Sequence, residues 1–309
     1  MKEMREIFGE KLVDLGKKNK KLIVLDADLN TSTRTDLFKE ELLGQFIQIG
    51  IAEQNLFGWA AGLSTFGFIP FPTTFAAFAI KRALDQIRVS IAYPKLNVKI
   101  PGCYAGISTG KGGASHQVVE DLAIMRAMPN MTVLYAGDGN ELMQMMDAMV
   151  EYEGPVYFRV LKPAVPSIFN EEYKFNWKPV QLRNGKDVAL ISTGFMTHKC
   201  IKAADKLESQ GIKAAILHVP CLKPLDPESI IKVASECGKI VTVEDHSIIG
   251  GLGGLVSEVL SQECPVYIKR LGFNDKFIES GEDEELLKKY GLSIDDIINA
   301  SLEVLKKKK

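Results

Sequence analysis

Short runs of apolar residues alternate with amphipathic stretches along the first half of the chain. Residues 3–18 have the spacing of an amphipathic helix, and LIVLDAD at 22–28 has the pattern of a buried strand that ends in acidic residues. More strand-like runs lie at 46–50, 68–70, 97–102, 131–137 and 155–163, and helix-like segments lie between them at 53–63, 74–92, 118–128 and 141–152. This alternation predicts a mainly parallel, doubly wound sheet.

The alternation stops between residues 164 and 185, where several prolines and an Asn-Gly pair indicate a linker. It resumes in the second half, and we expect strands near 187–193, 213–219, 239–244 and 265–270 with helices between them. Residues 280–307 predict two amphipathic helices, and Ser293 with Asp296 resembles a capping box at the start of the second. We therefore expect an α/β protein with two doubly wound, mainly parallel-sheet domains, at 1–165 and 186–309, joined by a linker at 166–185.

Composition adds few restrictions to this picture. The 309 residues suffice for two cores, and 46% apolar with 25% charged residues is ordinary for a globular chain. The net charge of −1 gives no indication of a nucleic-acid or membrane surface. The N-terminus lacks the apolar segment of a signal peptide, and no apolar run reaches membrane-spanning length. Five widely spaced cysteines favour reduced thiols, so we expect a cytoplasmic protein.

The stretch GIAEQNLFGWAAGLSTFGFIPFPTTFAAF at 50–78 contains the strongest chemical candidate. Glu53 lies at the expected start of an apolar helix. The helix dipole favours the ionised carboxylate and burial disfavours it, so this acid can hold a proton near neutral pH if burial dominates. A helix-capping acid is the alternative. Phe75 and Phe78 follow at helical spacing, either as core residues or as walls for a flat heterocycle.

His116 is the most informative of the four histidines. It lies near the end of the glycine-rich loop GISTGKGGASHQ at 106–117, just before an expected helix. Imidazole titrates near neutral pH and can hydrogen-bond a substrate hydroxyl, and loops often carry functional groups. A solvated loop histidine is the alternative. The remaining three, His198, His218 and His246, show no metal-ligand spacing.

The 50–78 stretch resembles the pyrimidine-binding domain of transketolase and its thiamine-diphosphate-dependent relatives. In that family the helix glutamate contacts N1′ of the aminopyrimidine, and an aromatic residue after the P-x-T-x-F stretch lies against the ring. The resemblance implies that Glu53 is the proton relay that activates thiamine diphosphate. It also implies that Phe75 stacks on the pyrimidine and that Phe78 forms a second wall.

The resemblance extends over nearly all 309 residues. Residues 113–133 are similar to the transketolase active-site loop and the helix after it, and residues 241–260 and 277–292 are similar to the C-terminal domain. The family's N-terminal domain, which binds the diphosphate and Mg²⁺, has no counterpart in these residues. The resemblance therefore implies the C-terminal subunit of a split transketolase. We expect a separate diphosphate-binding subunit to complete the pocket, in an assembly built on a homodimer core or of the α2β2 type.

The resemblance also assigns substrate contacts. Arg5 and Ser32 match family positions that grip a sugar phosphate, a task suited to charge-assisted hydrogen bonds. Lys162 stands where the family usually has arginine, so the charge is kept but the bidentate fork is lost. His116 matches the loop histidine that contacts the donor near the reacting carbon. Phosphorylated sugars are the expected substrates.

Two positions depart from the family pattern. Tyr104 replaces a second histidine, and Gly112 replaces the aspartate that checks the stereochemistry of the donor hydroxyls. The favoured activity is transfer of a two-carbon ketol unit from a ketose phosphate to an aldose phosphate, with the specific donor left open. The alternatives are the β subunit of a 2-oxo-acid dehydrogenase, a fragment related to deoxyxylulose-phosphate synthase, and a non-catalytic partner subunit with the same fold.

Three further motifs favour structural roles. Residues 106–110 match the G-x-S-x-G nucleophile elbow, but the following residues are glycine-rich where that motif needs an apolar helix. Gly-Asp-Gly at 137–139 resembles the start of the thiamine-diphosphate magnesium motif, but Asn170 falls in the linker, so an N-capped strand-to-helix turn is favoured. IIGGLGGLV at 248–256 lacks the third glycine of a dinucleotide-binding loop.

Overall fold

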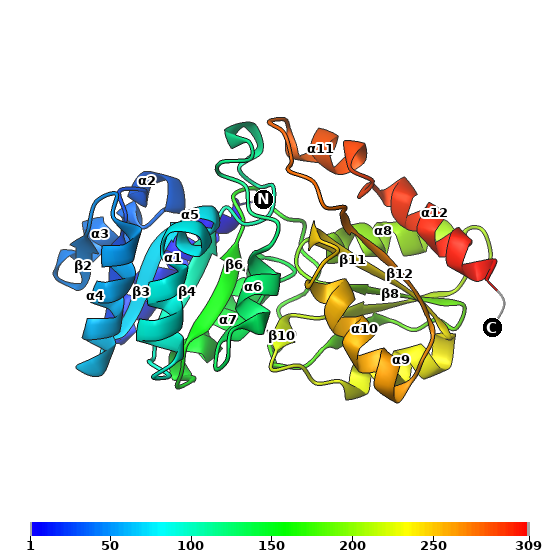
Figure 1. The fold of residues 1–309 in the computed structure, drawn as a ribbon, viewed down its shortest axis with the longest axis horizontal. Coiled ribbons are helices and arrows are strands. Elements are labelled where there is room, and N and C mark those ends of the chain that lie inside the picture. The colour runs from blue at the N-terminus through cyan, green and yellow to red at the C-terminus, as the bar shows by residue number, and fades with distance from the viewer. Residues whose placement is uncertain (1, 308–309) are drawn as a thin grey trace.

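The computed structural model describes residues 2–307, which form two α/β lobes lying side by side (Figure 1). The first lobe contains a seven-stranded sheet and the second a five-stranded sheet. Helices pack on the faces of both sheets. The expected fold class, two mainly parallel α/β domains, is confirmed.

The first sheet has the strand order β10-β5-β6-β4-β3-β1-β2, and every neighbouring pair except β10 and β5 is parallel. Its strands are β1 (Leu22–Asp26), β2 (Phe46–Gln48), β3 (Ile69–Phe75), β4 (Lys99–Cys103), β5 (Thr132–Leu134), β6 (Val156–Val160) and β10 (Cys221–Lys223). Strand β1 is buried along its whole length because it lies between β2 and β3 and under helices, which explains its continuous apolar run.

The helices of the first lobe follow the expected alternation, with one correction and with short helices between β1 and β2 that the sequence did not predict. They are α1 (Met4–Lys18), α2 (Asn30–Thr33), α3 (Asp36–Glu41), α4 (Glu53–Thr65), α5 (Ala76–Arg82), α6 (Asp121–Ala127), α7 (Gly139–Glu151), the short 3₁₀ helices η1 (Leu43–Gln45) and η3 (Gly110–Gly112), and the π-helical segment η2 (Gln86–Ala92). The sequence predicted one helix over 74–92, but this region is the end of β3, then α5, then η2.

The prolines of β3 explain why the sequence predicted too short a strand. Proline lacks the N–H of a sheet ladder and is rare inside sheets. Here Pro70 and Pro72 pair with β1 on one side, whereas pairing with β4 on the other side begins at Thr74. The two prolines therefore occupy a part of β3 that has a paired neighbour on one side. Strand β3 consequently carries the chain as far as Phe75, the first aromatic residue of the candidate site.

The second sheet has the order β12-β11-β8-β9-β7, with β7 antiparallel to β9 and the other pairs parallel. Its strands are β7 (Val180–Arg183), β8 (Val188–Ser192), β9 (Ala214–His218), β11 (Lys239–Ser247) and β12 (Tyr267–Phe273). Its helices are α8 (Met196–Glu208), α9 (Glu228–Cys237), α10 (Leu252–Glu263), α11 (Asp283–Lys289) and α12 (Ile294–Leu305). Strand β7 comes from the end of the expected linker, and the capping box of Ser293 and Asp296 is present at α12.

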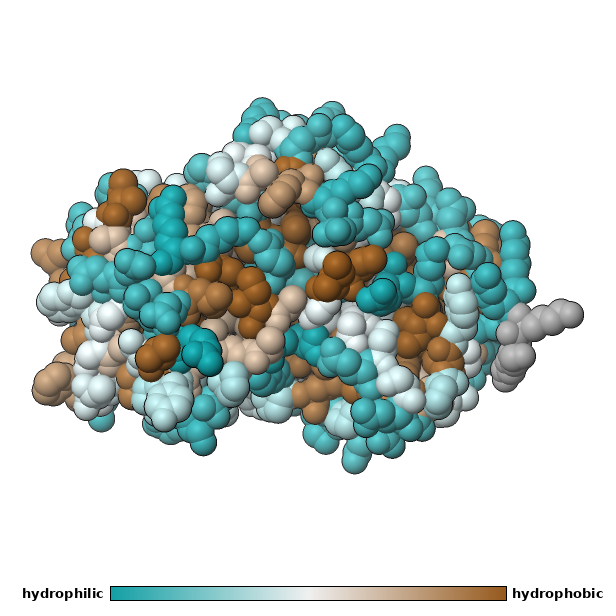
Figure 2. Space-filling model, in the orientation of Figure 1, coloured by the Kyte–Doolittle hydropathy of each residue, from teal (hydrophilic) through white to brown (hydrophobic). Residues whose placement is uncertain are grey.

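The two lobes share a sheet and a core. Strand β10 comes from the second half of the chain but pairs with β5 of the first sheet. The Lys223 ammonium donates hydrogen bonds to the carbonyls of Arg126 at 2.8 Å and Met128 at 2.5 Å. One buried apolar cluster contains both Leu134 of the first lobe and Leu222 of the second. Figure 2 shows a largely hydrophilic face on which hydrophobic residues gather in patches over both lobes.

A buried charge network also joins the lobes. Arg159 of β6 forms salt bridges with Asp121 of α6 and, at 3.2 Å, with Asp245 of β11. The hydroxyl of Tyr157 donates to Asp121 at 2.6 Å, and that of Tyr135 donates to Asp245 at 3.1 Å. Within residues 2–307, none of the helices has the length and apolar character needed to cross a membrane.

Candidate functional site

Glu53 is the first residue of α4, and its side chain is 5% exposed. The Arg82 side chain at the end of α5 reaches it, and Nη1 donates a hydrogen bond to Oε1 at 2.7 Å. Arg82 is itself 47% exposed. The acid is therefore fixed in a buried position, whereas its cationic partner lies at the surface and has access to water.

Aromatic rings continue from this ion pair. The Arg82 guanidinium lies 3.9 Å from the centroid of the Phe78 ring, a cation–π contact. Phe78 stacks on Phe75 with centroids 5.5 Å apart, and Phe75 stacks on Tyr104 at 4.4 Å. The interplanar angles of 29° and 28° make both contacts stacked, with Phe75 between the other two rings and tilted against each. Strand β3 supplies Phe75, and α5 begins directly after it, which places Phe78 one turn along.

His116 lies against the same rings. Its imidazole centroid is 5.2 Å from that of Phe78 and 6.2 Å from that of Phe75, with the ring planes at steep angles. The Ser115 hydroxyl is 2.8 Å from Nδ1 of His116. The loop at 106–117 thus brings its histidine to the aromatic row.

The other end of the row carries positive charge. Arg5 donates from Nη1 to the Tyr104 hydroxyl at 2.8 Å and to the Ser32 carbonyl at 3.1 Å. The Lys162 ammonium lies 6.0 Å from the Tyr104 ring centroid. All three expected anion-binding residues, Arg5, Ser32 and Lys162, therefore gather around Tyr104. Ser32 accepts the hydrogen bond from Arg5 with its backbone carbonyl, whereas the resemblance implied that Ser32 contacts the substrate.

Burial and pairing act in opposite directions on these groups. Burial lowers the pKa of Arg5, but the hydrogen bond to Glu3, at 2.6 Å from Nε, helps to raise it above the ordinary value. Burial raises the pKa of Tyr104, and the Arg5 charge only partly offsets this. Arg5 therefore stays a cation and Tyr104 a neutral hydroxyl. An anionic ligand at this end must compete with Glu3 for Arg5.

Tyr104 and Arg82 are the site residues whose roles the sequence did not reveal. Tyr104 was recognised only as a departure from the family pattern, yet it links the aromatic row to Arg5. It has φ of +57°, a left-handed conformation that non-glycine residues rarely adopt. Arg82 falls within the helix expected at 74–92, and the sequence pattern assigned it no role in the site. Its position four residues beyond Phe78 gives no signal in the sequence that it would reach back to Glu53.

A cavity of 490 Å³ lies between the lobes. Ser108, Leu161 and Pro163 line it from the first lobe, and Lys199 and Asp283 from the second. Neither Glu53 nor the rings of the aromatic row line it. Within this chain Phe75 and Tyr104 are buried, at 8% and 7% exposed. The row reaches the surface at Phe78, His116 and Arg82, where it could form one wall of a pocket closed by another chain.

The Gly-Asp-Gly turn at 137–139 is a capped helix start. Asp138 accepts the N–H of Glu141 at 2.9 Å at the start of α7, and its second oxygen accepts those of Ile168 at 2.6 Å and Phe169 at 2.8 Å. Both carboxylate oxygens of Asp138 thus accept hydrogen bonds from within the chain, as expected for an N-capped turn. Among residues 2–307, no group of three or more His, Cys, Asp or Glu side chains is arranged to hold a metal ion.

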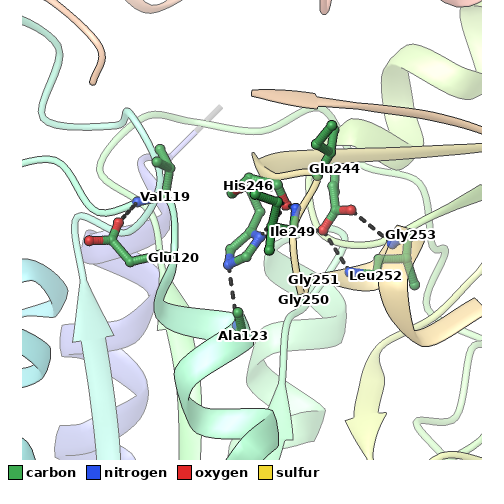
Figure 3. A network of polar contacts seen from close by, with 12 residues as sticks. Val119, Glu120, Ala123, Glu244, His246, Ile249, Gly250, Gly251, Leu252 and Gly253 are labelled. Atoms are coloured by element: carbon green, nitrogen blue, oxygen red, sulfur yellow. Dashed lines mark hydrogen bonds and ion pairs between the residues drawn. The ribbon is translucent and has the colours of Figure 1, made fainter. Parts of the chain in front are cut away.

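The glycine-rich turn before α10 is also filled by the chain itself (Figure 3). The Glu244 carboxylate accepts the N–H groups of Leu252 at 2.6 Å and Gly253 at 2.8 Å. Burial raises the pKa of Glu244 to about 7. Nearby, His246 Nε2 accepts the N–H of Ala123 at 3.2 Å and so connects β11 to α6. A carboxylate at the helix N-terminus leaves that position unsuited to a pyrophosphate, which supports the structural reading.

The aromatic row fits the pyrimidine half of thiamine diphosphate. A flat heterocycle needs flat apolar walls, which Phe75 and Phe78 provide, and its ring nitrogen needs a fixed acid, which Glu53 provides. Comparisons with known proteins point the same way. Residues 1–167 match the family model of the transketolase pyrimidine-binding domain, and residues 178–297 match that of the transketolase C-terminal domain. The chain belongs to the transketolase family.

Its relatives within the transketolase family include proteins of about the same length. A Methanocaldococcus jannaschii protein, provisionally named a transketolase C-terminal section, is 45% identical over 99% of this chain and 97% of its own length. The 6-deoxy-6-sulfo-D-fructose transketolase subunit SqwH of a Clostridium species is 38% identical over 99% of this chain and 95% of its own. A solved structure of a split gene transketolase, an inactive beta4 tetramer, superposes with a TM-score of 0.91 at 45% identity and covers 99% of both chains.

Proposed function

We propose that this chain is the C-terminal subunit of a thiamine-diphosphate-dependent transketolase and transfers a two-carbon ketol unit from a ketose phosphate to an aldose phosphate. The observation that carries the proposal is the continuous row from Glu53, through three stacked rings, to Arg5 and Lys162. One end offers an acid and flat walls, and the other offers cations. This order suits a heterocyclic cofactor at one end and an anionic sugar at the other.

At the cofactor end, the residues of this chain bind and move a proton. Thiamine diphosphate, when bound, supplies the thiazolium carbon that stabilises the two-carbon fragment. Glu53 would share a proton with the pyrimidine nitrogen, because its carboxylate is fixed at the start of α4 and Arg82, its partner in this chain, is exposed enough to give way to the ring. Phe75 and Phe78 hold the ring plane and exclude water from one side of it. A dry surface strengthens the contact between the acid and the ring nitrogen.

Between the two ends, His116 lies against Phe78 and would move a proton at a donor hydroxyl near the reacting carbon. Nδ1 is engaged by the Ser115 hydroxyl, so Nε2 is the nitrogen that faces this task. Arg5 and Lys162 hold the distal anion of the sugar, and Ser32 lies beside them. The Clostridium relative is named for a sulfonated sugar. Because sulfonate and phosphate are both tetrahedral oxyanions, the charges of Arg5 and Lys162 suit either.

The partner of this subunit would supply the diphosphate and Mg²⁺ sites. A C-terminal section, a transketolase subunit and a split gene transketolase are named among its relatives, which supports a two-chain enzyme. The solved beta4 tetramer is described as inactive, which supports a requirement for a second kind of chain. We propose an α2β2 assembly around a homodimeric core, with Mg²⁺ held mainly by the partner.

The test is a ketol-transfer assay with xylulose 5-phosphate and ribose 5-phosphate, thiamine diphosphate and Mg²⁺, with and without a candidate diphosphate-binding subunit. We expect activity only when both subunits are present. Glu53→Gln in the mixture should lower kcat by roughly 100-fold or more, since proton transfer by a positioned side chain contributes about that much. Glu41→Gln is the matched control, because Glu41 pairs with Lys17 at the exposed surface.

Each part of the proposal can fail separately. Robust transfer by this chain alone would refute the need for a partner. Unchanged activity of Glu53→Gln would refute the proton relay. A mixture that binds cofactor but transfers nothing from xylulose 5-phosphate should be retested with the sulfonated ketose, and activity there would reassign the donor. If neither donor supports ketol transfer, a non-catalytic subunit would be favoured.

A further inference from the structure

The loop that carries His116 is attached to the second lobe at its base. We define the His116 loop as residues 106–117. Gly106 has φ of +63°, and a Cβ there would collide with the Asp245 carboxylate of β11. Just beyond the loop, the Val119 carbonyl accepts the N–H of Ser247 at 2.6 Å. Both ends of the His116 loop therefore rest on the C-terminal end of β11.

The tip of the loop is held by the second lobe as well. Gln117 is 3% exposed, and its Nε2 donates to the Gly110 carbonyl at 3.3 Å and to the Glu279 carbonyl at 3.2 Å. One buried amide thus closes the loop on itself and ties it to the segment before α11. Buried hydrogen bonds of this kind fix position, because breaking one leaves polar groups away from water.

Glycines allow the two backbones to come close. Gly113 has φ of +67°, and a Cβ there would lie 2.5 Å from the Ser280 hydroxyl oxygen. Gly110 has φ of +51°, and a Cβ there would lie 2.9 Å from Asp283 Oδ1. Side chains at these two positions would push the loop off the segment 279–283. Figure 1 shows the two stretches side by side at the top of the molecule, the loop in green and the segment leading to α11 in orange.

The same segment reaches toward the substrate end of the aromatic row. Burial raises the pKa of Asp283 to about 6, and the nearby Lys162 ammonium opposes that rise. At the outer edge, Lys111 and Glu282 form a salt bridge of 2.8 Å with both side chains exposed. Segment 279–283 therefore contacts the His116 loop and also lies near enough to Lys162, the cation that we assign to the substrate anion, for their charges to interact.

We infer that segment 279–283 of the C-terminal domain is the positioning element for the His116 loop, and that Gln117 is the residue that transmits its hold. This inference rests on the proposed function for its catalytic consequence. A glycine-rich loop is flexible and does not by itself fix the position of its histidine. The inference therefore gives the C-terminal domain a direct role at the site. Small displacements of a reacting group lower rates strongly, so the hold determines how well His116 meets the donor.

The experiment compares Gln117→Met with Lys111→Met in the full chain, alone and assembled with the diphosphate-binding subunit. Gln117→Met keeps the volume and removes both buried hydrogen bonds, whereas Lys111→Met removes an exposed link between the same two segments. Ser280→Val is a second variant on the opposite side of the contact, at an exposed position whose change does not threaten folding. The rate of amide hydrogen exchange at residues 110–117 measures how firmly the His116 loop is held, and this measurement does not require enzymatic activity.

We expect exchange of 110–117 to speed up by roughly tenfold in Gln117→Met and Ser280→Val and to stay unchanged in Lys111→Met. In the assembled enzyme, Gln117→Met should lower kcat by roughly tenfold and leave the KM of the acceptor unchanged. Unchanged exchange in both Gln117→Met and Ser280→Val would overturn the inference, as would faster exchange with normal kcat. A wild-type assembly without ketol transfer would defeat the proposed function, while the exchange result would still decide whether 279–283 holds the loop.

Discussion

Two buried carboxylates of the first lobe each pair with an arginine, and the two arginines lie in opposite surroundings. Glu53 pairs with Arg82, whose side chain is 47% exposed. Asp121 pairs with Arg159, and both side chains are 0% exposed. The first pair lies where the aromatic row reaches the surface, and the second is enclosed between the lobes. The same chemical contact therefore has two different settings within one lobe.

The enclosed pair is structural because each member has further partners. Arg159 also contacts Asp245, and Asp121 also accepts a hydrogen bond from the Tyr157 hydroxyl. Burial alone would raise the pKa of Asp121, but the Arg159 charge and hydrogen bonds hold it below its ordinary value. Arg82 can turn toward water, so the Glu53 carboxylate can change partners. A buried acid is thus a candidate for chemistry when its counter-ion is replaceable.

The largest effect should come from Arg159→Met. Removing this guanidinium leaves Asp121 and Asp245 buried without their cation, and breaking a buried pair costs about 3–5 kcal/mol in the free energy of unfolding. Urea unfolding of the full chain measures it. Lys17→Met removes an exposed pair with Glu41 and should cost less than about 1 kcal/mol. Equal losses in the two variants would erase the distinction between enclosed and open pairs.

A smaller effect should appear on acidification, through His246. Burial lowers the pKa of His246 to about 4, against 6.5 for the unfolded chain, so the unfolded state binds the proton first as pH falls. Stability is therefore lost as pH falls from 6.5 to about 4, by about 3 kcal/mol in total. Protonation of Nε2 would also break the hydrogen bond from Ala123.

The comparison with His246→Gln isolates this contribution. Arg159, Asp121 and Glu244 also act on His246, and Glu244 has a raised pKa whose contribution to stability falls as pH rises. These groups are common to both proteins, so their own titration largely cancels in the difference. Urea unfolding at several pH values gives that difference. A difference that does not change between pH 6.5 and 4 would show that His246 is not held neutral.

The smallest effect should come from Arg82→Met. Water can replace an exposed guanidinium, and the start of α4 stabilises the Glu53 carboxylate, so the free energy of unfolding should change by less than about 1 kcal/mol. Urea unfolding beside Arg159→Met tests this directly. A loss of about 3 kcal/mol or more would make the Glu53 pair as structural as the enclosed one.

Local patterns in the sequence were sufficient for most of the fold. The buried run of β1, the cap at Asp138 and the capping box at Ser293 follow from short-range rules, and the structure has all three. The proline strand β3 contradicts a short-range rule, because its prolines are tolerated where β4 does not pair. Strand β10 could not be assigned to the first sheet from sequence, since only the packing of the lobes selects its partner.

The candidate site divides in the same way. The sequence by itself determined which residue types are available, including the acid at the start of α4, the two phenylalanines and the loop histidine, because helix starts, aromatic spacing and glycine-rich loops are local features. The tertiary structure alone decided that Arg82 reaches Glu53, that Tyr104 links the rings to Arg5, and that residues 279–283 hold the His116 loop. These contacts join residues 29, 99 and 162 positions apart. Contacts over such separations depend on how sheets and lobes pack, which no local pattern records.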